Sequence, residues 1–390
     1  MGTVRTNSRR LRATAAGALL VVVSCALAAG MVEVAFRLMP GLLLPAGAYG
    51  AGVRHPQLNM NVHGQRLLYK KGNFIERMPN SEGFLDIEHS LTKPEGTVRV
   101  GFFGDSYVES GQIPLESVFF RRLAHRMSGK VETLGFGISG WGTLQAARAY
   151  DTLAPRYDLD IAVYLFVEND PGNNWIDLSR QTGEAGSGMP YAELRSDGNS
   201  YEVGWIVEPG RETWWHGAGK WLQRHSLLAH VVQDRISKLA TYGVQLRSSK
   251  AAKQMSDRSG SVPSVNDLPS TWPREYRDRA ERLGELILRD WRDAAAARHT
   301  YFMVFYVPRG EDQLLGTLSV EDTWLPWLRA VCDRHGIPLV DPSESLGRAL
   351  EEGHHVYGDH WSPEGHEVVS EVLAQTLSPV IDESIPHGER

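Results

Sequence analysis

The chain alternates short β-rich segments with helical ones, and this alternation limits its fold more than any other feature. Three β-rich runs cover residues 97–103, 131–136 and 160–167, and apolar residues recur at helical spacing within 115–127 and 143–153. Strands that alternate with helices predict a parallel sheet with helices on both faces. In that architecture ligands bind beyond the carboxyl ends of the strands.

After the third strand the alternation stops and later resumes. Residues 171–299 form a predicted insertion that is rich in tryptophan, with helices expected near 222–239 and from about 274. A strand, a helix, a strand and a helix are then expected, in chain order at 301–307, 324–335, 338–341 and 363–377. We therefore predict one α/β domain over residues 96–378, followed by a short tail at 379–390.

The first forty residues add a second constraint. Four arginines and no acidic residue occur among residues 1–12, and Ala13–Val32 carries no charge. At about 1.5 Å per residue, a helix of that length spans about 30 Å, the thickness of a bilayer's hydrocarbon core. The positive-inside rule places residues 1–12 in the cytoplasm, residues 13–35 across the membrane and the α/β domain outside. We predict a single-pass protein of the cell membrane, with its domain in the periplasm if the cell is Gram-negative.

Two other interpretations apply to the same end of the chain. A cleaved signal peptide is one, although its apolar region is normally only about 7–15 residues long. Val22-Val-Ser-Cys25 also resembles a bacterial lipobox, which would make Cys25 a lipidated N-terminus. The apolar run continues past Cys25 to Val32, where lipoproteins usually turn polar. We therefore expect an uncleaved signal anchor, with a lipoprotein as the alternative.

Composition excludes several classes of protein. The balance of 41 Lys+Arg against 47 Asp+Glu gives a net charge of −6, which disfavours nucleic acid as a partner. Two cysteines, Cys25 and Cys332, are too few for a disulfide-rich scaffold or a cysteine-ligated zinc site. Residues 36–95 carry glycine, proline and asparagine throughout and are predicted to be a spacer that packs on the domain.

Polar or glycine-rich residues follow each of the first three predicted strands. Gly104-Asp-Ser106 places a serine where a helix begins, which suits either a nucleophile near backbone N–H groups or a helix N-cap. The loop Gly135–Gly142 has four glycines and can direct backbone N–H groups at a developing oxyanion. Asn169 follows the third strand, and its amide can donate another hydrogen bond or cap a turn.

A fourth candidate lies near the end of the chain. His360 falls in a loop directly before a predicted helix, and a histidine of near-neutral pKa is the usual general base for a serine. His354, His355 and His366 crowd the same stretch, but no zincin-type spacing of histidine and carboxylate is present. We therefore expect neither a metal site nor another cofactor.

Taken in order, these segments resemble the SGNH (GDSL-type) hydrolase superfamily. Gly104-Asp-Ser106, Gly140, Asn169 and His360 correspond to its four sequence blocks. The resemblance covers about residues 80–170 and 300–378, and it implies a flavodoxin-like three-layer α/β/α sandwich. The implied nucleophile is Ser106 and the implied base is His360. The implied oxyanion hole consists of the backbone N–H groups of Ser106 and Gly140 and the side chain of Asn169.

Two positions depart from the family pattern. Gly135 stands where the second block usually has asparagine. Family members also have an aspartate two or three residues before the histidine, where this chain has Gly358 and Tyr357. The nearest carboxylate, Asp359, is adjacent to His360 and can orient the imidazole only if the loop turns sharply. The expected triad is thus Ser106, His360 and Asp359, with a Ser–His dyad held by a backbone carbonyl as the alternative.

Three functions fit these residues. The first is a serine esterase that hydrolyses an acyl ester, such as acetyl, on an extracytoplasmic substrate such as a cell-surface glycan, through an acyl-Ser106 intermediate. The second is an O-acetyltransferase with the same site and a membrane-bound acyl-transfer partner, because the Asp359-His-Trp361 string is like that of alginate-acetylation proteins. The third is a non-catalytic glycan-binding module that uses tryptophans between residues 205 and 221.

Overall fold

A computed structural model describes most of the chain in two compact units. The described residues are 3–49, 66–71, 73–127, 129–182, 189–205, 219, 221–222, 225–233, 235–236 and 262–384. One unit comprises Met1–Ala51, Leu68–Phe74 and Arg211–Ala252, and the other comprises the rest of the chain. Trp214, Trp215 and residues 237–261 of the predicted insertion lie outside the described residues.

Five parallel strands form the central sheet of the larger unit. They are β4 (Val98–Gly104), β5 (Val131–Gly137), β6 (Ile161–Phe166), β9 (Tyr301–Tyr306) and β10 (Leu339–Val340). Their spatial order is β10-β9-β6-β4-β5, and every neighbouring pair is parallel. With the strands renumbered 1 to 5 along the chain, this is the flavodoxin-like order 2-1-3-4-5. The predicted fold class is confirmed.

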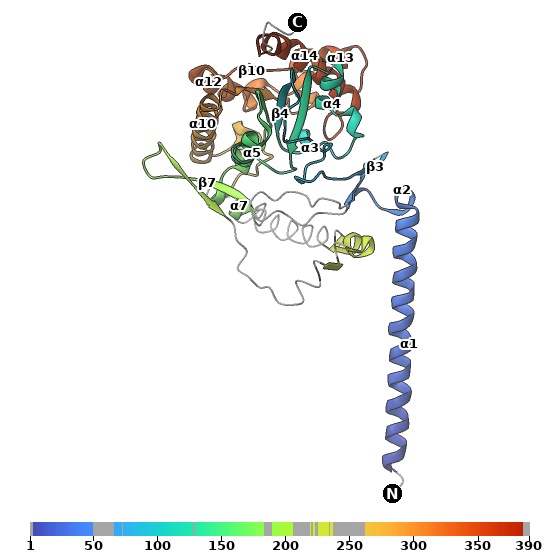
Figure 1. Ribbon diagram of the computed structural model, residues 1–390. Helices are drawn as coiled ribbons and strands as arrows, with labels where there is room; N and C mark the ends of the chain where they lie inside the picture. The colour runs from blue at the N-terminus through green and yellow to red at the C-terminus, as the bar shows by residue number, and fades with distance from the viewer. Residues whose placement is uncertain are drawn as a thin grey trace. The chain divides into compact units, whose positions relative to one another are not determined.

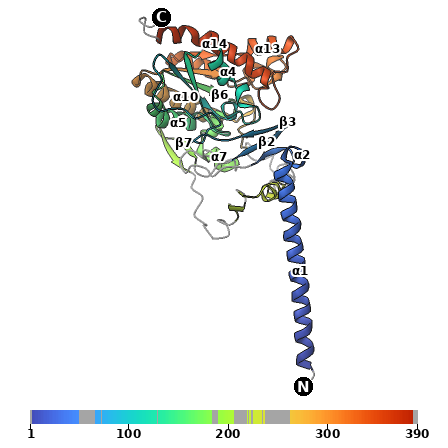
Figure 2. The same cartoon turned by 45° about the vertical axis from the view of Figure 1, so that its right-hand side comes forward.

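Helices cover both faces of this sheet. One face carries α5 (Thr143–Tyr157), α10 (Arg274–Ala297) and α12 (Leu325–His335), and the other carries α4 (Phe119–Arg126), α13 (Ser343–Glu351) and α14 (Pro363–Ser384), as Figures 1 and 2 show. Successive side chains of a strand point to opposite faces. Phe103 therefore packs with Trp291 of α10, whereas Phe102 packs with Phe119 of α4. The sheet is the middle of three layers.

Part of the predicted insertion belongs to this body. The helix α10 connects β6 to β9, and its apolar stripe of Leu283, Ile287 and Trp291 is buried against the sheet. Within the same stretch, α6 (Asp170–Asn173) and α7 (Ile176–Thr182) are followed by an antiparallel hairpin of β7 (Pro190–Leu194) and β8 (Tyr201–Trp205). A helical stripe can be recognised from residue spacing, but the surface that it covers depends on residues far away in the sequence.

The smaller elements include several that the sequence did not predict. The short helices include α3 (Ser106–Glu109) and two that were not predicted, α11 (Glu311–Leu314) and α13. In addition, 3₁₀ turns occupy Leu115–Ser117, Pro269–Thr271 and Val320–Asp322. The predicted spacer contributes a three-stranded sheet of β1 (Gly47–Tyr49), β2 (Leu67–Lys71) and β3 (Asn73–Arg77). Strands this short lack a periodic run long enough to recognise in the sequence.

The N-terminal helix α1 runs from Thr3 to Leu38 and continues into α2 (Pro40–Leu43). Helical structure thus extends through the described part of the predicted basic tail. An 18-residue window within Ala16–Leu38 has a mean hydropathy of 2.3, and none of that window is buried. Among the described helices this stretch is the one that is long and apolar enough to cross a bilayer, and it overlaps the predicted span of residues 13–35.

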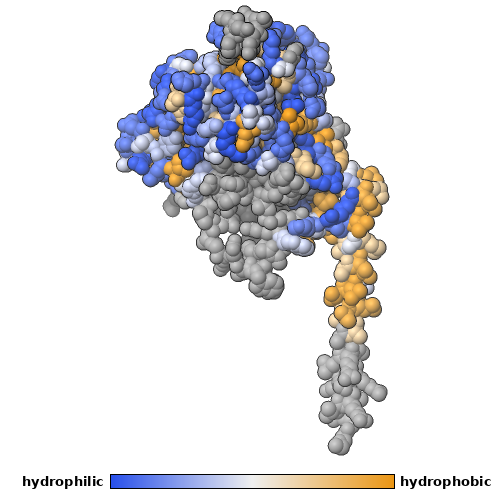
Figure 3. Space-filling model, viewed as in Figure 1, coloured by the Kyte–Doolittle hydropathy of each residue, from blue (hydrophilic) through white to orange (hydrophobic). Residues whose placement is uncertain are grey.

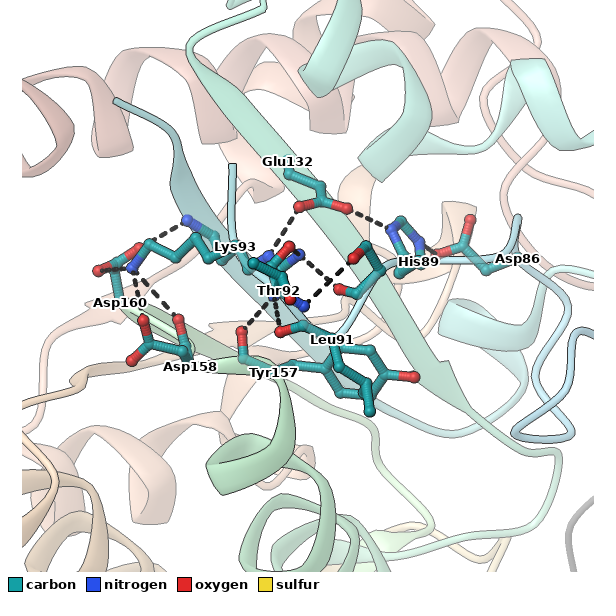
Figure 4. Close-up of polar contacts among 11 residues, drawn as sticks. Asp86, His89, Leu91, Thr92, Lys93, Glu132, Tyr157, Asp158 and Asp160 are labelled. Carbon is teal, nitrogen blue, oxygen red and sulfur yellow. Dashed lines mark hydrogen bonds and ion pairs between the residues drawn. The ribbon is translucent and has the colours of Figure 1, made fainter. Parts of the chain in front are cut away.

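A buried polar network fastens residues 86–93 to the amino ends of the strands (Figure 4). Arg99 at the start of β4 is fully buried, and its Nε donates to Glu132 of β5 at 2.7 Å. Its other nitrogens donate to the backbone carbonyls of residues 90, 91, 92 and 157. His89 lies between Glu132 at 2.7 Å and Asp86 at 3.0 Å. A buried guanidinium is tolerated here because these acceptors replace its water.

The His89 contacts predict a pH-dependent stability. Burial alone would lower the pKa of His89, but the hydrogen bonds and charges of Asp86 and Glu132 outweigh it and raise the pKa above the ordinary 6.5. A raised pKa in the folded state stabilises the fold below the ordinary value, and this stabilisation is lost as pH rises through the raised value. We expect His89→Gln to lower the free energy of unfolding by about 1.5–3 kcal/mol at pH 6 and by less at pH 9.

Urea unfolding of the full-length protein in detergent measures this difference at both pH values. The matched control is His125→Gln, because His125 pairs with Glu116 at 3.1 Å on an exposed surface, where such pairs contribute little. If His89→Gln lowers the free energy of unfolding equally at pH 6 and pH 9, the prediction that His89 is charged in the folded protein at pH 6 is wrong.

Candidate active site

The strand β4 ends at Gly104, and α3 begins two residues later at Ser106. The N-cap of α3 is Asp105, whose Oδ1 accepts a hydrogen bond from the Tyr107 N–H at 3.0 Å. Because Asp105 caps the helix, the hydroxyl of Ser106 is not needed for capping. Ser106 Oγ lies 2.7 Å from His360 Nε2, although the two residues are 254 positions apart. The N-cap alternative for Ser106 therefore does not apply.

The loop that carries His360 turns sharply. Tyr357 and Trp361 form an isolated antiparallel bridge, and the Gly358 N–H donates to the His360 carbonyl at 2.7 Å across the turn. Buried side chains anchor both ends, because Trp361 Nε1 donates to the Tyr357 hydroxyl at 2.9 Å and that hydroxyl donates to the Pro308 carbonyl at 2.7 Å. Asp359 and His360 at the tip both line the same cavity. The sharp turn required for Asp359 to act on His360 is present.

The glycine-rich loop after β5 is attached to the helix that carries Ser106. Glu109 of α3 is buried, and its Oε2 accepts from the Ser139 N–H at 3.0 Å and also from the Ser139 hydroxyl. The next residue, Gly140, has φ +83, a conformation that strains any residue with a Cβ. At Gly137 a Cβ would lie 2.4 Å from Cβ of Val108, so glycine lets β5 approach α3 closely. The positions of Ser106 and Gly140 are thus coupled through α3.

Glu109 was not singled out from the sequence, and its contacts predict an effect on catalysis. We expect Glu109→Ala to lower kcat by about 10- to 100-fold with KM little changed, because a loosened Gly140 N–H would act as a poorer oxyanion donor. Ser139→Ala is the matched control, since it keeps the backbone N–H bond to Glu109 and should cost less than 10-fold. Hydrolysis of an aryl acetate measures both variants, and equal effects would contradict the positioning role of Glu109.

The substitution of asparagine by Gly135 has a packing reason. A Cβ at Gly135 would lie 2.6 Å from Cζ of Phe120, a buried residue of α4. The Gly135 N–H also donates to Asp86 Oδ2 at 2.8 Å. Phe120 thus fills the space that a side chain at this position would need, which explains glycine where the sequence resemblance led us to expect asparagine.

Asn169 lies three residues beyond the end of β6 and is the N-cap residue of α6 (Asp170–Asn173). It lines a cavity of about 360 Å³ together with Ser106 and His360. Its Oδ1 is buried and has no hydrogen-bond partner among the described residues. An amide on the cavity wall with its oxygen buried can present its NH₂ group to a ligand. A cavity of this volume is in the range of small-molecule sites.

Three buried carboxyl groups surround the site and were not selected from the sequence. Burial raises the pKa of Asp105 and of Glu168 to about 7, and burial together with the charge of Asp105 raises the pKa of Asp170 well above its ordinary value. Asp170 Oδ2 accepts from the Tyr164 hydroxyl at 2.5 Å and from the Val167 N–H at 2.8 Å, which holds the turn that carries Asn169. All three residues are adjacent in sequence to Ser106 or Asn169. Their burial depends on the tertiary structure, so the sequence alone did not identify them.

The neighbouring histidines do not converge on the site. His366 is fully buried, burial lowers its pKa to about 3, and its Nδ1 accepts from the Phe119 N–H at 3.2 Å. His354 is exposed and lies 3.5 Å from Glu364. Within the described part of the chain no three histidine, cysteine or carboxylate side chains are grouped to hold a metal.

The fold has neighbours among solved structures, but no family model and no curated protein matches the chain. One neighbour is a lipolytic protein of the G-D-S-L family from Veillonella parvula DSM 2008, at 11% identity over 72% of this chain and 99% of that chain, with a TM-score of 0.36. Another is a carbohydrate acetylesterase family member from Sinorhizobium meliloti, at 13% identity over 73% and 100%, with a TM-score of 0.34. A third is an acetyl xylan esterase, at 11% identity over 72% and 100%, with a TM-score of 0.38. Because these neighbours are so distant in sequence, the function of the present chain is inferred from the residues of its own site.

Proposed function

We propose that this protein is an SGNH-type serine ester hydrolase that works through an acyl-Ser106 intermediate. The observation that carries the proposal is the 2.7 Å contact between Ser106 Oγ and His360 Nε2, two residues that line a cavity beyond the carboxyl ends of parallel strands. A serine hydroxyl in contact with an imidazole nitrogen is the arrangement that nucleophilic catalysis requires. Placement at the sheet's carboxyl edge agrees with where such folds bind ligands.

The reaction would proceed in two steps. His360 Nε2 removes the proton from Ser106 Oγ as that oxygen attacks the acyl carbonyl, and the same proton then passes to the departing alcohol. Water next gives up a proton to His360 and attacks the acyl-serine, which releases the carboxylic acid and returns the proton to Ser106. In each step the backbone N–H groups of Ser106 and Gly140 and the Asn169 amide would stabilise the oxyanion.

The cavity lining supports a short acyl group on a polar alcohol. Glu168, Asp359 and Arg309 all line it, and Arg309 Nη1 lies 3.9 Å from Glu168 Oε2. Charged walls would be costly to desolvate against a long hydrocarbon chain. We therefore propose an acetyl ester as the substrate, on a molecule such as a glycan outside the cytoplasm.

One observation also favours an O-acetyltransferase. A second cavity of about 490 Å³ shares Arg309 with the first and is lined further by His355, Tyr357 and Gly358. Because the two cavities meet at Arg309, the second would offer a place for an acceptor alcohol. In that case the acceptor would replace water in the second step, and a membrane-bound partner would supply the acyl group.

Incubation of the purified full-length protein with an aryl acetate, with and without an oligosaccharide acceptor, distinguishes these functions. Turnover with water alone supports the hydrolase, and acylation of the oligosaccharide supports the transferase. Absence of both reactions would contradict each enzymatic function and leave the glycan-binding module.

We further propose that α1 anchors the protein with the α/β unit outside the cytoplasm, because the arginines precede the apolar span. Protease added to intact spheroplasts should digest the α/β unit. Protection of that unit until the cells are lysed would contradict the orientation.

A further inference from the structure

Within the smaller unit, the segment of residues 221–236 forms hydrogen bonds with the last turns of α1. Glu33 accepts hydrogen bonds from the backbone N–H groups of Leu227 and Leu228, at 3.2 and 2.9 Å, and from the Ser226 hydroxyl at 2.9 Å. One turn further on, Arg37 donates to the His225 carbonyl. Glu33 directly follows the charge-free run that ends at Val32. These contacts therefore hold residues 225–228 beside the last turns of α1, next to the end of the charge-free run.

One side of this segment is partly buried within the smaller unit. Residues 227–233 are helical, and Leu227 and Val231 pack with Phe36 of α1 and the buried Leu44. The His230 ring meets the Tyr49 ring edge-on, with centroids 5.4 Å apart. Side-chain packing thus reinforces the hydrogen bonds to α1 and limits how far the segment can move from it.

Other side chains of the segment leave large apolar groups in solvent. Trp221, Leu222, Val232 and Ile236 are 59%, 49%, 48% and 60% exposed. Figure 3 shows that the described surface of α1 is likewise apolar. Exposed apolar groups concentrated on one part of a protein mark a surface that contacts a partner or a membrane.

The charge of the segment favours an anionic surface. Residues 221–236 contain two arginines against one aspartate, a net charge of +1 in a chain whose total is −6. Basic residues interspersed with tryptophan and aliphatic side chains are typical of segments that lie in the headgroup layer of an anionic bilayer. Tryptophan in particular prefers the membrane–water interface.

We propose that residues 221–236 lie on the anionic phospholipid surface beside α1 and form a second membrane contact. Trp221, Leu222, Val232 and Ile236 would enter the boundary between headgroups and acyl chains. This contact rests on the proposed membrane span of α1 and is independent of the proposed esterase activity. It would restrain the smaller unit at the bilayer surface, in addition to the single anchoring helix.

The test uses the full-length protein reconstituted in vesicles of phosphatidylcholine and phosphatidylglycerol, with or without bromine on the upper acyl carbons. Bromine quenches only those tryptophans that contact the acyl region. We expect that bromine quenches less of the tryptophan fluorescence in Trp221→Phe than in the wild type. Trp205→Phe is the matched control, because Trp205 is an exposed tryptophan on β8, outside this segment. Ile236→Trp in the Trp221→Phe background should restore the quenching.

Each outcome bears on the proposal. Loss of quenching in Trp221→Phe and its return with Ile236→Trp would support it. Equal quenching of the wild type and Trp221→Phe, or quenching of Trp221 by aqueous iodide alone, would overturn it in favour of solvent or a protein partner. Failure of the protein to float with the vesicles would overturn the α1 span and this contact together, whereas aryl acetate turnover reports on the esterase separately.

Discussion

Ser106→Ala is expected to lower kcat for aryl acetate hydrolysis by about 10⁴- to 10⁶-fold, because it removes the only atom proposed to form the acyl-enzyme. Ser106 Oγ lies 2.7 Å from His360 Nε2 and has no capping duty that the substitution would disturb, since Asp105 caps α3. The fold should therefore survive. Residual turnover would come from the oxyanion donors and substrate binding, which contribute without the nucleophile.

Two measurements check this result. Steady-state release of the aryl alcohol gives kcat, and mass spectrometry after treatment with a fluorophosphonate should find a single adduct on Ser106 in the wild type. Ser139→Ala is the matched control, since it removes a hydroxyl from the neighbouring loop and should keep the adduct. Turnover of Ser106→Ala within 10-fold of the wild type would exclude the acyl-Ser106 intermediate.

Asp359→Asn is the second large effect that we expect, a loss of about 10⁴-fold in kcat. The turn closed by Gly358 and the bridge between Tyr357 and Trp361 bring the loop tip, with Asp359 and His360, to the cavity wall. If Asp359 orients His360, an amide in its place can favour the wrong imidazole tautomer and cannot stabilise the imidazolium. The loss should appear in kcat rather than KM.

The alternative is a dyad in which a backbone carbonyl holds the imidazole. In that case Asp359→Asn should cost less than about 10-fold, or about 1.4 kcal/mol of barrier, because the carbonyl already sets the tautomer. Glu364→Gln is the matched control, since Glu364 is an exposed acid in the first turn of α14, outside the residues that line the cavity. The pH profile of kcat/KM provides a second readout, because removing a carboxylate near His360 should lower the pKa of the base.

Much of the α/β body could be predicted from local patterns. The segments predicted as strands at 97–103, 131–136 and 301–307 match β4, β5 and β9 to within one residue at each end, because strands of a sheet buried on both faces are largely apolar. Two site residues, Ser106 and Asn169, could also be selected from the sequence because each follows a predicted strand. Their convergence follows from parallel strands that end at one edge.

Other features could not be predicted because they depend on contacts between distant residues. The apolar stripe of α10 predicted a helix, but not that this helix covers the sheet between β6 and β9. Glu109 became a candidate only once its buried carboxylate was found to accept from the Ser139 N–H. The raised pKa of Glu168 likewise results from burial, which no neighbouring residue in the sequence specifies.

The sequence alone determined the alternation of strands and helices, the charge-free run over residues 13–32 and the identity of the polar groups after each strand, because these depend on the order of residues and on backbone geometry. Only the tertiary structure decided which groups meet. It brought Ser106 to His360 across 254 positions, made Asp105 the N-cap, placed the ring of Phe120 where a side chain at position 135 would stand, and tied Glu33 to residues 226–228. Such contacts depend on packing between elements far apart in the chain, and no local pattern encodes them.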